Sequence, residues 1–107
     1  MTTFDERERA FETKFALEQE RVFLGRARGT RALGEWAALQ LGLAGEVALN
    51  YVHELRRLDV ADRTGSALVE KIVHDFDGHG VRTSAEAIRA RWDEARLQAI
   101  VDLGSGR

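Results

Sequence analysis

The fold is decided by residues 3–41, TFDERERAFETKFALEQERVFLGRARGTRALGEWAALQL, which contain no proline. Thr3 and Glu6 have the spacing of a capping box, in which each side chain accepts a hydrogen bond from a backbone N–H at the start of a helix. The next residue, Gly42, can take the left-handed conformation that ends a helix. We therefore predict one helix over this stretch. A bend or break is expected near Gly25–Thr30, because each glycine costs a helix about 1 kcal/mol relative to alanine.

Three shorter helices are predicted to follow, over residues 45–64, 66–78 and 83–103. Thr83 and Glu86 form a second capping box at the start of the last one. In each segment the apolar residues recur at helical spacing. The side chains expected to face the core are Ala48, Tyr51, Val52, Leu55, Leu58, Leu68, Val69, Ile72, Val73, Phe76, Ile88, Trp92, Ala95, Ala99 and Leu103. Helices with short connections predict an all-α, antiparallel four-helix bundle.

The predicted helices differ greatly in length. At about 1.5 Å per residue the first helix would be about 60 Å long, against about 20–30 Å for the others. Only about half of it can be covered, and we expect that half to be the second one, with Leu33, Trp36 and Leu41 in the core. We therefore divide the chain into an N-terminal arm, residues 1–20, which overhangs, and a helical bundle domain, residues 21–107.

The arm carries a narrow apolar stripe. Phe4, Phe11, Phe15 and Val22 are spaced so that they fall within a sector of about 40° on a helix. Most of the residues around them are charged. Such a stripe is typical of a helix that lies in a groove on another protein. The alternative is that the stripe folds back as part of the core, which the length mismatch disfavours.

The arm is predicted to be disordered in the free protein. Burial of three phenylalanines and a valine contributes roughly 6–12 kcal/mol, whereas the ordering of about 20 residues costs at least as much. An isolated helix of this length is marginal in water. Residues 1–20 should therefore be frayed when free and helical when bound, and NMR order parameters near those of the bundle would contradict this.

Composition excludes several classes of protein. Charged residues make up 32% of the 107, but the net charge is only −2, so the broad basic field of nucleic-acid binders is missing. No apolar run is long enough to cross a bilayer, the acidic N-terminus is no secretory signal, and cysteine is absent. Neither a phosphate-binding GxxxxGK[ST] spacing nor a nucleophile–base constellation is present. We predict a cytoplasmic regulatory protein that is not an enzyme.

Residues 74–79, HDFDGH, gather side chains that can bind metals. The loop lacks the further ligands and the glutamate at position twelve that an EF-hand requires. Histidines near the negative end of a helix dipole explain the same pattern, so we predict no metal site. His53 is expected at the surface.

Two other groups of residues have structural explanations. Trp36 and Trp92 are expected in the core rather than stacked on a ligand. The basic cluster of Arg26, Arg28 and Arg31 is expected to be solvated, although it could touch an acidic partner.

The first 16 residues, MTTFDERERAFETKFA, resemble the zeta subunit of bacterial F-type ATP synthase, an ATPase inhibitor family. The likeness continues at Glu20, Phe23, Ala27 and Arg28. It is specific again in LGEWAALQLG, residues 33–42, and extends to the turn that contains Asp77, Gly80 and Val81. The sequence departs from the family pattern at Leu24, Gly29, Thr30 and Glu35.

The resemblance implies a mechanism. It implies that the arm inserts into a catalytic interface of the synthase head, formed by its alpha, beta and gamma subunits, and blocks rotation in the ATP-hydrolysing direction. Three phenylalanines would be the apolar anchors, and charged residues would meet the rim of the groove. The residues expected to contact the partner are Phe4, Asp5, Arg7, Glu8, Phe11, Glu12, Lys14 and Phe15.

The resemblance also implies a location and few other ligands. The chain would be a monomer when free and peripheral to the inner membrane through the synthase, without direct membrane insertion. No cofactor is expected, although weak adenine-nucleotide binding on the bundle stays open. Two alternatives remain: a helical adaptor or self-associating module, and a nucleotide- or metal-responsive sensor.

Overall fold

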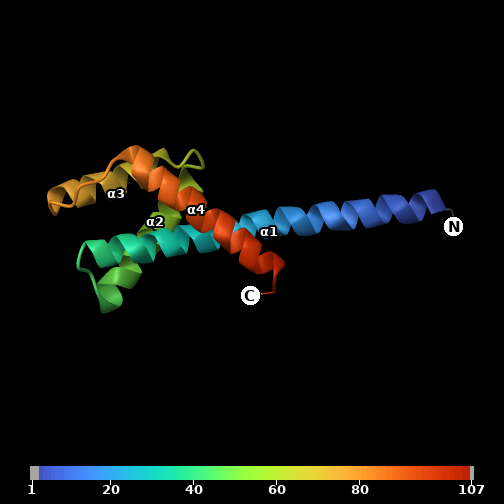
Figure 1. Ribbon diagram of the computed structural model, residues 1–107, viewed down its shortest axis with the longest axis horizontal. Coiled ribbons are helices and arrows are strands. Elements are labelled where there is room, and N and C mark those ends of the chain that lie inside the picture. Colours follow the sequence, from blue (N-terminus) through green and yellow to red (C-terminus); the bar gives the residue numbers. More distant parts are fainter. Residues whose placement is uncertain (1–2, 107) are drawn as a thin grey trace.

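Helix is the only regular secondary structure in residues 3–106, which the computed structural model describes; side chains are described for residues 5–106. The four helices are α1 (Thr3–Gln40), α2 (Gly45–Ala61), α3 (Ser66–Gly78) and α4 (Ala85–Gly104). Figure 1 shows α2, α3 and α4 gathered around the second half of α1, with α4 crossing α1 obliquely. The predicted all-α fold with four helices is confirmed.

Helix α1 is one uninterrupted helix of 38 residues. The predicted break near Gly25–Thr30 is wrong, because helical backbone continues through this region. The molecule measures 65 × 25 × 20 Å, and Figure 1 shows that the first half of α1 supplies the long dimension by projecting from the other helices. The predicted overhang is therefore confirmed.

The glycines that suggested a break lie where α4 crosses α1. Gly25 and Gly29 are buried against Ile100 and Arg96 of α4. A Cβ atom added at Gly29 would lie 2.7 Å from the Cα atom and 2.8 Å from the backbone nitrogen of Arg96. The missing side chains let two helix backbones approach closely, so packing overrides the poor helix propensity of glycine.

Substitution of Gly29→Ala should lower the free energy of unfolding by about 1–3 kcal/mol, because the added methyl group meets the backbone of α4 and no rotamer change relieves the overlap. The sign of this change in the free energy of unfolding is informative, since helix propensity alone would make alanine stabilising by about 1 kcal/mol relative to glycine. Urea unfolding measures the effect. Gly78→Ala is the control, because a Cβ atom there meets nothing within 4 Å. Equal stability changes in the two variants would contradict the close crossing.

The core lies between the second half of α1 and the other helices. The side chains predicted to face inward on α2, α3 and α4 are all buried or half-buried, as are Leu33, Trp36 and Leu41 of α1. The residues that form the main cluster are Leu33, Ala37, Ala38, Leu41, Tyr51, Leu55, Leu68, Val69, Ile72, Phe76, Ile88 and Trp92. Apolar periodicity thus identified the core correctly.

The start of α4 differs from the prediction. Ser84 is the N-cap, and its hydroxyl accepts a hydrogen bond from the backbone N–H of Ala87 at 3.1 Å. The predicted capping box of Thr83 and Glu86 is therefore wrong by one residue. Serine and threonine are both good N-caps, so the sequence alone did not distinguish the two neighbours. The hydrogen bonds that would test the first capping box involve Thr3, whose side chain lies outside those described.

Helix α2 ends at Ala61, earlier than predicted, because Asp62 organises the turn to α3. Its carboxylate accepts hydrogen bonds from the backbone N–H and the hydroxyl of Thr64 at 3.1 and 2.6 Å, and from the N–H of Ala67 at 3.1 Å. Gly65, at φ 82°, has the left-handed backbone that this turn requires. The hydrogen bonds from Thr64 and then Ala67 hold the pKa of Asp62 below its ordinary value.

This lowered pKa predicts a pH dependence. The fold favours ionised Asp62, so its stabilising contribution is present above the pKa of the unfolded chain, near 3.8, and is lost as the pH falls through the lower folded value. The Asp62→Asn variant has no carboxyl group that titrates at this position. The melting temperatures of wild type and variant should therefore differ by a constant amount at neutral pH and converge below about pH 4. A difference that stays constant through the acid range would contradict the prediction.

Candidate partner-binding site

The N-terminal arm is exposed along its whole described length. Every residue from 5 to 24 is exposed, and Gly25 is the first buried one. The exposed fractions are 71% for Phe11, 56% for Phe15 and 57% for Val22. In Figure 1 the outer part of α1 projects without a neighbouring helix, and the C-terminal end of α4 approaches only its base, where Gly104 lies next to the Arg21 side chain. The alternative in which the stripe folds back into the core is therefore contradicted.

The structure places the predicted partner-binding residues along one rod rather than around a cavity. Phe4 belongs to the helix, but its side chain lies outside those described. The other predicted contact residues are all exposed: Asp5, Arg7, Glu8, Phe11, Glu12, Lys14 and Phe15. A helix with aromatic anchors and charged flanks is equipped to bind a groove. Whether the arm is frayed in the free protein stays a prediction, which amide hydrogen exchange would test.

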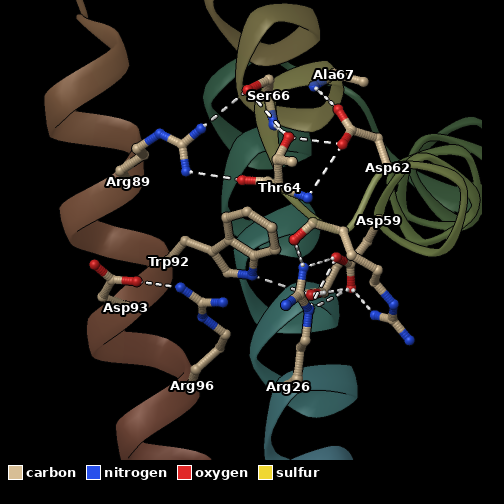
Figure 2. A network of polar contacts seen from close by, with 12 residues as sticks. Arg26, Asp59, Asp62, Thr64, Ser66, Ala67, Arg89, Trp92, Asp93 and Arg96 are labelled. Atoms are coloured by element: carbon tan, nitrogen blue, oxygen red, sulfur yellow. Dashed lines mark hydrogen bonds and ion pairs between the residues drawn. The ribbon is translucent and has the colours of Figure 1, made fainter.

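A network of polar side chains holds the base of the arm (Figure 2). Asp59 of α2 is only 4% exposed and accepts hydrogen bonds from Arg26 of α1, at 3.0 Å from Nε and 2.5 Å from Nη2. The same guanidinium donates to the carbonyl oxygen of Arg63 at 3.0 Å, and Arg63 reaches Asp59 at 3.3 Å. A buried carboxylate needs such partners, because an unpaired charge is costly to bury.

The network continues to α4 through a hydroxyl. The indole N–H of Trp92 donates to Thr30 Oγ1 at 3.0 Å, and the Thr30 hydroxyl donates to Asp59 at 3.3 Å. The guanidinium groups of Arg26 and Arg96 lie 5.4 and 4.4 Å from the centre of the Trp92 rings. Three helices thus meet at the point where α1 leaves the body, and their contacts hold α1 at Arg26 and Thr30.

This network corrects one prediction and adds a residue that the sequence analysis missed. Arg26 was expected to be solvated, but it is part of the network; Arg28 is exposed, and Arg31 forms an exposed ion pair with Glu35. Asp59 was not singled out. It lies four residues after Leu55, on the apolar face of α2. The sequence does contain an indication of this role, because Asp59 is a single carboxylate on the apolar face of α2.

His79 and Tyr51 each contact Asp75. His79 Nδ1 lies 2.8 Å from the backbone oxygen of Asp75, and His53 is exposed as predicted. The Tyr51 hydroxyl donates to the Asp75 carboxylate at 3.0 Å, and burial together with this hydrogen bond raises the pKa of Tyr51 above its ordinary value. Within the described residues no three metal-binding side chains come together.

Both tryptophans contribute to packing. Trp92 is 1% exposed, and Trp36 is half-buried with its ring centre 5.5 Å from that of Phe76. The expectation that they belong to the core is confirmed. No helix in residues 3–106 combines the length and the apolar character needed to cross a bilayer.

One of three comparisons with known proteins gives a match. The family model described as ATPase inhibitor subunit zeta matches residues 1–102, which include all of α1, α2 and α3, and α4 as far as Asp102. No curated protein and no solved structure matches the chain. Because the match spans nearly the whole sequence, this chain belongs to the ATPase inhibitor subunit zeta family.

Proposed function

We propose that this protein inhibits ATP hydrolysis by an F-type ATP synthase by inserting its N-terminal arm into an interface between catalytic subunits. The observation that carries the proposal is the exposure of Phe11 and Phe15, on one side of a helix that projects from the body. Exposed aromatic side chains in line on a helix are the anchors of helix-in-groove binding. Membership in an inhibitor family supports the choice of partner.

The dimensions of the molecule support insertion of the arm up to the point where the helical bundle prevents further entry. Residues 5–24 form about 30 Å of exposed helix. Behind them the body is 25 × 20 Å across, too wide to follow a single helix into a cleft. The arm therefore enters the interface, and the wider body remains outside it. The network around Asp59 holds the orientation of α1 relative to the body. An arm that fills a rotating interface blocks turnover by occupancy alone, so this mechanism requires no cofactor and no catalytic residue.

The proposal extends to the state and place of the protein. The free chain is a monomer, and in the cell it is cytoplasmic and bound at the inner membrane only through the catalytic head. The contacts with the alpha, beta and gamma subunits are made by the eight predicted residues of the arm. The phenylalanines enter the groove, and the charged residues meet its rim.

The test is to add the purified chain to the cognate head enzyme during turnover and to follow ATP hydrolysis. We expect inhibition by the full chain and none by a chain that lacks residues 1–19. The truncated chain should keep nearly the same melting transition, because all residues from 5 to 24 are exposed and contribute nothing to the core. Undiminished inhibition by the truncated chain would refute the proposal.

The same exposed stripe favours one other function, a self-associating adaptor in which the arms of two copies pair. Pairing would bury Phe11 and Phe15 against their own copies and protect the arm from hydrogen exchange. Sedimentation at micromolar concentration distinguishes the two functions, because the adaptor requires a stable dimer and the inhibitor does not.

A further inference from the structure

A second apolar surface lies at the base of the arm, in a groove of about 720 Å³ between α1 and α2. Phe23 and Leu24 line it from α1, and Val60 lines it from α2. Their exposed fractions are 62%, 38% and 68%, so the described chain leaves this apolar surface largely uncovered. Exposed apolar patches of this kind mark binding sites more often than isolated apolar side chains do.

The groove faces a different side of α1 from the phenylalanine stripe. At 3.6 residues per turn, Phe23, Leu24 and Ala27 are centred about 145° from the midpoint between Phe11 and Phe15. A surface that covers the stripe therefore leaves the groove open. The groove begins at Phe23 and Leu24, a few residues after the arm ends at residue 20, so a protein that binds the arm has its own surface next to the groove.

The rim of the groove is basic and largely unpaired. It is lined by His53, Arg56, Arg57 and Arg63 of α2 and the following turn. Asp59 also lines it, but this carboxylate is already bound by Arg26 and Arg63. Within residues 5–106, Arg56 and Arg57 have no ion pair or hydrogen bond. An occupant with carboxylates would supply the charges that these two arginines lack.

We propose that this groove binds an acidic amphipathic helix of the enzyme head that the arm enters, as a second contact on a different side from the stripe. The inference rests on the proposed function, because it assigns the occupant to the same partner. The apolar side of that helix would cover Phe23, Leu24 and Val60. Its carboxylates would pair with Arg56 and Arg57, as opposite charges at the rim of an interface do.

The test compares the binding of full-length variants to the purified cognate head by surface plasmon resonance, at low and at physiological salt. Arg56→Glu and Arg57→Glu should each weaken binding about tenfold, with the larger loss at low salt. Arg82→Glu is the matched control: it makes the same change of charge at an exposed arginine that does not line the groove. It should change the dissociation constant by less than about twofold.

The apolar part of the groove has its own variant. Val60→Ser should weaken binding about tenfold without a change in melting temperature, since this side chain is mostly exposed. If the groove variants bind as tightly as Arg82→Glu, the second contact does not exist. If the wild type sediments as a dimer that Arg57→Glu dissociates, the occupant is a second copy, and the proposal is also refuted.

Failure of the inferred contact is separable from failure of the proposed function. The same samples are assayed for ATP hydrolysis. A wild-type chain that binds the head without slowing hydrolysis would refute the inhibitory function, and the groove variants would still report on the second contact. Full inhibition with no effect of the groove variants would refute only the contact.

Discussion

A chain with Phe11→Ala and Phe15→Ala should lose about 10²- to 10⁴-fold in affinity for the catalytic head. Each buried phenylalanine contributes roughly 1.5–3 kcal/mol, and every 1.4 kcal/mol is about a tenfold change in the dissociation constant. The melting temperature should hardly change, because the side chains are 71% and 56% exposed in the free protein. Alanine is the better helix former, so loss of helical structure would not explain the result. Titration of ATP hydrolysis with the variant measures the loss.

The control for this variant removes the same kind of surface elsewhere. Leu39 and Leu49 are 72% and 60% exposed and lie away from the arm, near the connection between α1 and α2. Leu39→Ala with Leu49→Ala should leave inhibition within about twofold of the wild type. If both double variants lose potency equally, general loss of apolar surface is responsible and the stripe is not the anchor.

Substitution of Asp59→Ala should lower the free energy of unfolding by about 3 kcal/mol. The carboxylate is 4% exposed and is the common acceptor for Arg26, Arg63 and Thr30. Its removal leaves Arg26 partly buried without its counter-charge, which is the costly way to break a buried ion pair. Urea or thermal unfolding followed by circular dichroism measures the loss.

Asp93→Ala provides the matched comparison. Asp93 pairs with Arg96, but its side chain is 60% exposed, and exposed ion pairs contribute about 0–1 kcal/mol. Both substitutions remove one carboxylate from a helix next to an arginine, so only burial and partners differ. A loss at Asp59 no larger than that at Asp93 would show that the network does not hold the base of the arm.

Much of the architecture was predictable because it depends on local properties. The spacing of apolar residues identified the inward faces of α2, α3 and α4, and Ile88 and Trp92 are buried as expected. The length of α1 predicted the overhang, and the spacing of Phe11 and Phe15 predicted an aligned, exposed stripe. These properties follow from 3.6 residues per turn and the rise per residue, which hold whatever the helix packs against.

Local rules failed where the outcome depended on contact between distant segments. Gly25 and Gly29 suggested a break, since helix propensity disfavours glycine, but the crossing with α4 needs their small size. Arg26 was expected in solvent, but a carboxylate 33 residues away binds it. The N-cap of α4 fell on Ser84 rather than on its neighbour, because either side chain satisfies the local rule.

The sequence by itself determined the helices, their apolar faces and an arm too long for its body, because periodicity and length are properties of each segment alone. Only the tertiary structure decided that α1 stays unbroken, that Asp59 joins three helices at the base of the arm, and that a basic-rimmed groove lies beside it. The physical reason is that burial and pairing depend on which helices meet and at what distance. A single sequence does not state those distances.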